Sequence, residues 1–263
     1  MSDRAEEGRR PSTLEIYERL KEDIIQLRYA PGCQISEHEI ALRFSVSRTP
    51  VKACFIRLET EGFIVVKPKS GSFVSLLDPQ EVEESIYLRS LLEADMVRQL
   101  IGELQSERLA LLRGLLEAQR QVLAQGRPEL GRPLRIQTVA SEQETQALQR
   151  LAHFVRLDDD FHACFFRWAG HERLWAGIRR LELHYQRFRQ LDIQSSGVPE
   201  RILEEHQAIY ERLEARDYNG YLDLLQQHLY GNVRRLLGEQ KERYARYFLS
   251  SEEKLSSRPW PFC

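Results

Sequence analysis

Four side chains in the second half of the chain have types and spacing that suit metal coordination. Asp158 and His162 are four residues apart, which places them on one face of a helix. His206 and His228 lie on two later helical stretches that a short turn around Asp217 must fold antiparallel. In a helical bundle such residues can converge on one internal point. Three imidazoles and one carboxylate suit a divalent transition ion such as Zn²⁺, Ni²⁺ or Mn²⁺, and they leave positions open for water or a ligand.

The spacing alone also permits a simpler interpretation. A single histidine on an apolar helix face is more often a packed or hydrogen-bonded core residue than a metal ligand. The pattern therefore predicts about one ion per chain only if all four side chains meet, which a bundle of antiparallel helices would allow.

A second stretch, residues 36–74, has the pattern of a DNA-reading module. Ser36-x-x-Glu39 is a capping box that starts one helix, and Ser47 starts another, with Pro50 in its first turn. The few residues between the two helices allow only a tight turn. Two short helices joined in this way form a helix-turn-helix, whose second helix presents its N-terminal residues to a DNA groove.

The first two turns of that second helix carry hydroxyl and positively charged groups that suit phosphate oxygens and guanine edges: Ser47, Arg48, Thr49 and Lys52. Gly62 ends the helix, and two short strand-like runs around Lys69 predict a hairpin with a basic tip. Residues 43–77 carry six positive and two negative side chains, a net charge of +4, in a chain whose formal charge is −2. The alternative is a small α/β module with a solvated basic face.

The composition is that of a helical globular protein. The 263 residues are 42% apolar and 30% charged, with only 14 glycines. No apolar run approaches the roughly 18 residues that span a bilayer, and the N-terminus lacks a signal-peptide core. The four cysteines are scattered without a C-x-x-C pair, which favours a reducing cytoplasm. The isoelectric point of about 6.4 argues against nonspecific coating of nucleic acid.

The helices and breakers predict a mainly α protein with two domains. We expect a disordered arm over 1–11, a winged helix-turn-helix with a small β-hairpin wing over 12–77, an all-α antiparallel bundle over 78–249, and a polar tail over 250–263. Ser12-x-x-Glu15 caps the first helix, and Asp78-Pro79 marks the domain boundary. The bundle is predicted to contain a loop over 126–140 and helices over 79–101, 106–125, 142–168, 174–191, 200–215 and 218–247.

The DNA-reading module resembles a known family. The run Ser47-Arg48-Thr49-Pro50-Val51-Lys52, followed by Leu58-Glu59-x-Glu61-Gly62, is similar to the winged helix of the GntR family of bacterial transcription regulators, over roughly residues 12–77. The family usually has arginine at position 52, and lysine lacks the bidentate fork of arginine. The resemblance implies DNA contacts from His38, Ser47, Arg48, Thr49, Lys52 and the wing around Lys69 and Gly71.

The second domain resembles the FCD effector domain that many GntR regulators carry. The resemblance rests on Leu157-Asp158-x-x-Phe161-His162, Ala169-Gly170, Glu204-Glu205-His206 and His228-Leu229. It implies that Asp158, His162, His206 and His228 are the metal ligands. Position 171 is histidine where the family usually has asparagine, and the 126–140 loop is longer than usual. His153 and His184 match no family position and are expected to be surface or structural residues.

An ion inside a bundle attracts a carboxylate, and a nearby guanidinium can bind the other carboxylate oxygen. Arg89, near the conserved arginine of the family's first effector-domain helix, is the candidate; the alternative is that it only pairs with Glu93. Tyr185 and Arg189 are further candidates for the effector pocket. The resemblance thus implies a homodimeric, cytoplasmic bacterial regulator, nucleoid-associated when bound, that reads a palindromic DNA operator. A small organic acid would relieve repression.

Three alternatives remain at this point. A metal-dependent enzyme is disfavoured because the sequence shows no separate general base with an orienting partner. A regulator with a metal-free effector pocket would use the histidines only for hydrogen bonds. A structural DNA-binding protein without an effector would bind DNA independently of any metabolite.

Overall fold

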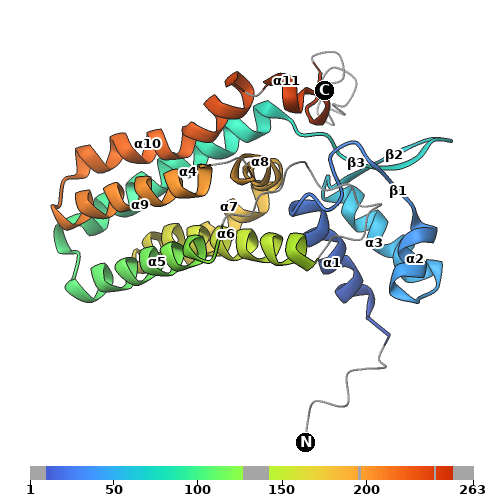
Figure 1. The fold of residues 1–263 in the computed structure, drawn as a ribbon, viewed down its shortest axis with the longest axis horizontal. Coiled ribbons are helices and arrows are strands. Elements are labelled where there is room, and N and C mark those ends of the chain that lie inside the picture. The colour runs from blue at the N-terminus through green and yellow to red at the C-terminus, as the bar shows by residue number, and fades with distance from the viewer. Residues whose placement is uncertain (1–9, 127–141, 195–196, 240, 251–263) are drawn as a thin grey trace, which may run out of the picture. The chain divides into compact units, whose positions relative to one another are not determined.

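The computed structural model describes residues 10–126, 142–194, 197–239 and 241–250. The predicted disordered arm, the 126–140 loop and the C-terminal tail lie outside these residues except at their edges. The described chain is mainly helical and forms two compact units that divide between Leu77 and Asp78 (Figure 1). The predicted fold class, a winged helix-turn-helix followed by a helical bundle, is confirmed.

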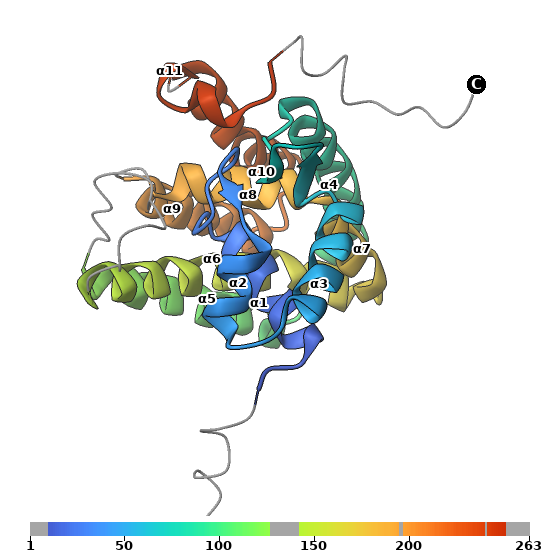
Figure 2. The same ribbon diagram turned by 90° about the vertical axis from the view of Figure 1, so that its right-hand side faces the viewer.

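Among the described residues, the first unit contains three α-helices, with α3 packed against both others (Figure 2). They are α1 (Thr13–Ile25), α2 (Glu37–Phe44) and α3 (Arg48–Thr60). The capping box at the start of α1 is formed, because Glu15 N–H donates to Ser12 Oγ at 3.2 Å and Glu15 Oε2 accepts from Ser12 N–H at 2.6 Å. The predicted box at α2 is wrong. Ser36 Oγ accepts from His38 N–H at 3.2 Å and caps the helix without Glu39.

The wing is a three-stranded antiparallel sheet in the order β1-β3-β2. Strands β2 (Ile64–Lys67) and β3 (Gly71–Val74) form the predicted hairpin. Strand β1 (Gln34–Ile35) was not predicted, because two residues are too few to show an alternating pattern. The described C-terminal end of the chain also returns to this unit, where Leu77 N–H donates to Tyr247 O at 2.8 Å.

The second unit is a bundle of long helices in which α4 packs against α6, α8 and α10, and α5 packs against α6 and α9 (Figure 1). Its helices are α4 (Pro79–Leu100), α5 (Ser106–Ala124), α6 (Glu142–Trp168), α7 (Glu172–Leu181), α8 (Leu183–Ile193), α9 (Val198–Glu214) and α10 (Tyr218–Arg234). A short turn joins α9 to α10, which pack side by side. No helix of the described residues is long and apolar enough to cross a membrane.

The predicted single helix over 174–191 is wrong. The chain forms α7 and α8, separated at Glu182, whose ψ of +24° departs from helical geometry. The sequence contains neither glycine nor proline at this point, so local propensity gives no signal. The Glu182 side chain is fully buried and pairs with Arg179 at 3.3 Å. Its other carboxylate oxygen, Oε1, lies 3.9 Å from Nη1 of Arg89 on α4, so the break accompanies a charge contact between helices.

The predicted helix over 218–247 is also wrong. Helix α10 ends at Arg234 and continues as a π-helical turn, η2 (Arg235–Glu239), followed by α11 (Lys241–Tyr244) and the 3₁₀ turn η3 (Ala245–Tyr247). Arg235 binds the buried Asp192 of α8 through two contacts of 3.1 and 2.5 Å. Such wider turns are rare and occur mostly as single turns within α-helices.

Candidate functional site

The bundle brings the four predicted ligand residues to one buried point. Asp158 and His162 lie one turn apart on α6, His206 comes from α9 and His228 from α10. One nitrogen or oxygen atom from each side chain lies within 4.8 Å of the corresponding atoms of the other three. Phe161 lies parallel to the His206 ring at a centroid distance of 4.4 Å, so the apolar core fixes the plane of that imidazole.

The inward-facing atoms of this cluster are close and incompletely hydrogen-bonded. His162 Nε2 lies 3.1 Å from His228 Nε2. His206 Nε2 lies 3.5 Å from Asp158 Oδ1 and has no hydrogen-bond partner among the described residues. A buried polar atom without a partner is costly, and a metal ion bound at this point would satisfy it.

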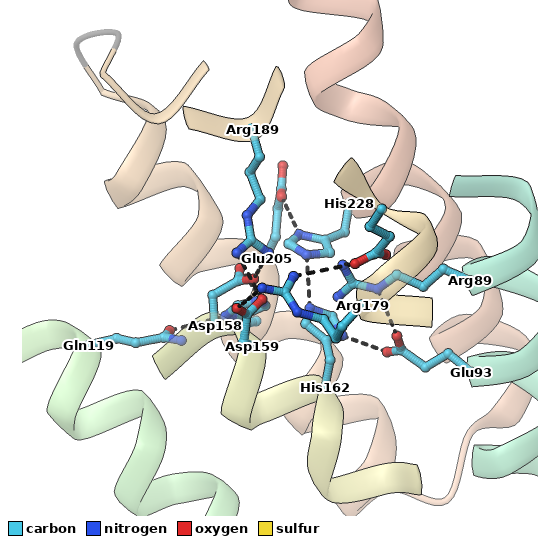
Figure 3. Close-up of polar contacts among 12 residues, drawn as sticks. Arg89, Glu93, Gln119, Asp158, Asp159, His162, Arg179, Arg189, Glu205 and His228 are labelled. Atoms are coloured by element: carbon cyan, nitrogen blue, oxygen red, sulfur yellow. Dashed lines mark hydrogen bonds and ion pairs between the residues drawn. The ribbon is translucent and has the colours of Figure 1, made fainter. Parts of the chain in front are cut away.

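The outward-facing atoms of the same side chains are all held by a second layer of residues (Figure 3). The Nδ1 atoms of His162, His206 and His228 contact Glu93 Oε1 at 2.6 Å, Gln119 Oε1 at 3.0 Å and Glu205 Oε2 at 2.8 Å, respectively. Because a carboxylate or amide oxygen only accepts, each Nδ1 carries the proton and each Nε2 keeps a lone pair. This arrangement is typical of metal-binding histidines, and the donor set fits a divalent transition ion.

The electrostatics keep these groups in the protonation states that a cation needs. Burial lowers the pKa of His162 and of His206 well below the usual value, so both imidazoles are neutral. Burial opposes ionisation of Asp158, but the guanidinium of Arg189, 2.8 Å away, lowers the pKa of this carboxyl far below its ordinary value. Burial raises the pKa of Glu93 to about 7, although Arg89 acts in the opposite direction.

The three predicted effector residues lie beside this cluster. Arg89, on α4, is fully buried, and its Nε donates to Glu93 Oε2 at 3.4 Å, so the pairing that the sequence offered as the alternative does exist. Its guanidinium lies 5.3 Å from the Trp175 ring centroid and 5.9 Å from that of Tyr185. Arg189 is committed to Asp158 and to a second carboxylate, that of Asp159.

Several residues that shape this site were not predicted. Figure 3 shows five of them: Glu93 as a histidine partner, Gln119, Asp159, Arg179 and Glu205. Trp175 and Glu182 also lie beside Arg89. Glu205 stands directly before His206 in the chain, but on a helix adjacent positions point in different directions, so adjacency did not suggest its role. Gln119 comes from α5 and has no sequence signal. The two remaining predicted histidines lie elsewhere: His153 is exposed, and His184 accepts from Asp78 N–H at 3.0 Å.

The DNA-reading helix begins as the sequence predicts. Ser45 takes a left-handed conformation with φ of +53°, which ends α2 and forms the tight turn before α3. Ser47 is the N-cap of α3 without a side-chain cap bond, so its hydroxyl is not committed to the helix. Arg48, Thr49 and Lys52 are exposed, and within the described residues neither charged side chain forms a salt bridge. These groups can therefore face a nucleic acid.

The wing and α2 add further exposed groups. His38 is exposed on α2. Lys69 and Gly71 both have positive φ at the tip of the β2–β3 hairpin, +63° and +110°. The value at Gly71 lies where side chains are strongly disfavoured, which explains glycine at this position. The Lys69 side chain is exposed at this tip.

Comparisons with known proteins agree with this architecture. Residues 12–74 match the family described as "Bacterial regulatory proteins, gntR family", and residues 84–231 match the FCD domain. An HTH-type transcriptional regulator in an unstable DNA locus of Streptomyces ambofaciens is 29% identical, over 92% of this chain and 93% of the relative. The HTH-type transcriptional repressor RspR of Escherichia coli K12 is 28% identical, over 83% of this chain and 86% of the relative.

The solved structure of E. coli McbR/YncC covers 87% of this chain with a TM-score of 0.60; at 19% identity this likeness concerns the fold alone. These families and relatives are transcriptional regulators and not enzymes, which confirms that expectation. The chain therefore belongs to the GntR family of bacterial regulatory proteins and is a DNA-binding transcriptional regulator with an FCD domain.

Proposed function

We propose that this regulator binds one divalent transition metal ion per chain through Asp158, His162, His206 and His228, with Zn²⁺, Ni²⁺ and Mn²⁺ as candidates, and that it responds to a small organic acid. The observation that carries the proposal is the convergence of four ligand atoms within 4.8 Å, with the second nitrogen of every histidine held by an oxygen. Such second contacts fix the ring orientation that coordination requires.

The effector is a carboxylate in this proposal. When bound, the ion supplies a positive charge with coordination positions open to a carboxylate oxygen. Arg89 offers two buried terminal nitrogens beside the cluster, and Tyr185 and Arg189 line the same region. A buried guanidinium that forms few hydrogen bonds favours an anionic ligand.

Two copies of the chain would read a palindromic DNA operator, with His38, Ser47, Arg48, Thr49 and Lys52 in the major groove and Lys69 and Gly71 at the wing. A homodimer would also cover exposed apolar side chains on two helices that pack together, Tyr87 and Leu91 on α4 and Leu174 and Leu181 on α7. The E. coli relative described as a repressor supports repression that the acid relieves. For such control, the acid must bind one arrangement of the dimer more tightly than the other.

Elemental analysis of untagged protein purified without chelators tests the metal site. We expect about one equivalent of Zn, Ni or Mn per chain. His206→Ala should lose most of it, whereas the exposed His153→Ala should retain it. An unchanged metal content in His206→Ala would refute the four-ligand site.

One observation favours a second candidate, the same regulator with a metal-free pocket. The 3.1 Å contact between His162 Nε2 and His228 Nε2 is a hydrogen-bond distance, and without an ion one of the two rings would donate across it by carrying a proton on Nε2 as well as on Nδ1. This candidate predicts no bound metal even after the protein is soaked in metal salts. Bound metal would exclude it, because the ion takes up both lone pairs.

A further inference from the structure

Beside the metal cluster lies a fully buried donor and acceptor pair that is not hydrogen-bonded. Neither terminal nitrogen of Arg89 donates a hydrogen bond within the described residues, and Glu182 Oε1 accepts none. Arg89 Nη1 and Glu182 Oε1 are 3.9 Å apart, and both side chains are 0% exposed. Buried charged atoms left in this way are costly, so a ligand that pairs with both is favoured.

Arg89 and Glu182 each form contacts through their remaining side-chain atoms. Arg89 donates through Nε to Glu93 Oε2 at 3.4 Å, and its guanidinium lies near the rings of Trp175 and Tyr185. Glu182 accepts from Arg179 Nη1 at 3.3 Å through Oε2. The uncommitted atoms, two N–H-bearing nitrogens and one carboxylate oxygen, therefore define what a ligand must offer: an anionic acceptor for Arg89 and a donor for Glu182 Oε1.

We propose that the effector is a 2-hydroxy acid. Its carboxylate accepts from the terminal nitrogens of Arg89, and its 2-hydroxyl group donates to Glu182 Oε1. The two functional groups sit on adjacent carbons, which matches a donor and an acceptor that are only 3.9 Å apart. The inference rests on the proposed function, because it assigns the class of the organic acid that binds at that site.

The surroundings favour a hydroxyl over the other donors that an acid could carry there. Glu182 already has two guanidiniums beside it, that of Arg179 at 3.3 Å and that of Arg89 at 3.9 Å, so an ammonium donor would be placed next to two positive charges. An acid without a donor would leave Glu182 Oε1 buried and unpaired. Sites built to pair a ligand hydroxyl discriminate strongly against the analogue that lacks it.

Calorimetric titration of the full-length, metal-loaded protein with three acids of one carbon skeleton tests the assignment. The probes are 2-hydroxybutyrate, butyrate and 2-aminobutyrate. We expect 2-hydroxybutyrate to bind at least about tenfold more tightly than butyrate, because it adds a hydrogen bond to a charged acceptor. Equal affinities, tighter binding of 2-aminobutyrate, or no binding of 2-hydroxybutyrate would overturn the inference.

Variants assign the preference to the named residues. Glu182→Leu should abolish the discrimination between 2-hydroxybutyrate and butyrate while butyrate still binds, and Arg89→Met should weaken both. Glu182→Gln preserves the shape and keeps a neutral acceptor, so it should reduce the preference severalfold if Glu182→Leu fails to fold. Glu214→Leu, at an exposed position on α9, is the matched control and should behave as the wild type.

Metal content and operator binding, measured in the same preparations, distinguish a failure of the 2-hydroxy acid assignment from a failure of the proposed function. Intact metal and DNA binding without a preference for the hydroxy acid would overturn the assignment of a 2-hydroxy acid and leave the proposed function standing. Wild-type protein that takes up no metal and binds none of the acids would instead contradict the proposed function.

Discussion

Glu93 Oε1 lies 2.6 Å from His162 Nδ1. The other oxygen of the same carboxylate accepts from Arg89 Nε at 3.4 Å, and Glu93 is fully buried between the two. One side chain thus joins a candidate metal ligand to the candidate effector arginine. Any ligand that moves Arg89 must also act on the carboxylate that orients His162, which gives metal binding and effector binding a shared structural element.

Glu93→Gln tests this link. The amide keeps the shape but removes the charge that strengthens the contact with His162 Nδ1, so metal affinity should fall by about 10- to 100-fold. Competition with a chromogenic chelator measures the affinity. Glu117→Gln, at an exposed position on α5, is the control and should leave it unchanged. Wild-type affinity in Glu93→Gln would mean that the carboxylate is not needed to orient the imidazole.

Arg48→Ala should abolish specific DNA binding while fold and dimer remain intact. Arg48 is exposed at the first position of α3 and forms no salt bridge among the described residues, so its guanidinium is available to base edges. Fluorescence anisotropy with operator and scrambled duplexes measures the loss. Arg98→Ala, which removes an exposed arginine of α4, controls for net charge. Retained operator affinity in Arg48→Ala would contradict the assignment of α3 as the recognition helix.

Lys69→Ala should weaken binding to every DNA sequence alike. Lys69 is exposed at the wing tip, where its ammonium can reach the phosphate backbone, and a phosphate contact carries no sequence information. The slope of log affinity against log salt concentration should flatten by about one unit. A loss confined to the operator would show that the wing reads bases.

Local sequence patterns were sufficient to predict several helix starts and turns of this protein. The tight turn between α2 and α3, the Ser12 capping box and the Asp78-Pro79 helix start each depend on residues a few positions apart, so the sequence predicts them directly. The convergence of Asp158, His162, His206 and His228 could be inferred only by adding the assumption of a bundle. The four-residue spacing places Asp158 and His162 on one helix face. His206 and His228 approach them only when their two helices pack antiparallel in the bundle.

Contacts between residues on different helices determine the features that the sequence did not predict. The break at Glu182 and the π-helical turn at Arg235 occur where a buried charge lies near a partner from another helix, Arg89 of α4 at 3.9 Å in the first case and Asp192 of α8 at 2.5 Å in the second. Gln119 and Glu93 orient histidines that lie 87 and 69 positions further along the chain. Local propensity carries no information about such contacts, which depend on how the helices pack.

Leu91→Glu should dissociate the proposed homodimer. Leu91 is 52% exposed on α4, one turn from Tyr87, and a carboxylate there would be buried against apolar atoms of the second copy. Sedimentation equilibrium measures the association. Leu111→Glu on α5, where the side chain is 59% exposed, is the matched control and should remain dimeric. Dimers of equal stability in both variants would place the interface elsewhere.

His184 should give the bundle a dependence on pH that does not involve the candidate metal ligands. Its Nδ1 accepts from Asp78 N–H at 3.0 Å, and its Nε2 lies 3.1 Å from Glu81 Oε2, so the folded protein holds the neutral ring. Burial, aided by Arg187, lowers the pKa of His184 to about 3. An unfolded histidine has a pKa of about 6.5. Between about pH 6.5 and 3 the unfolded chain therefore binds more protons, and the free energy of unfolding decreases as the pH falls through that window.

His184→Asn should remove this part of the acid sensitivity. The asparagine oxygen can accept from Asp78 N–H in place of Nδ1 but does not titrate. Between pH 7 and pH 5 the wild type should lose up to about 2 kcal/mol more unfolding free energy than His184→Asn, since each pH unit below the unfolded pKa contributes about 1.4 kcal/mol. Urea unfolding at the two pH values measures the difference, in which all other titrating groups cancel. His153→Asn, at an exposed position, should follow the wild type. Parallel pH dependences of the wild type and His184→Asn would mean that His184 is not held neutral by the fold.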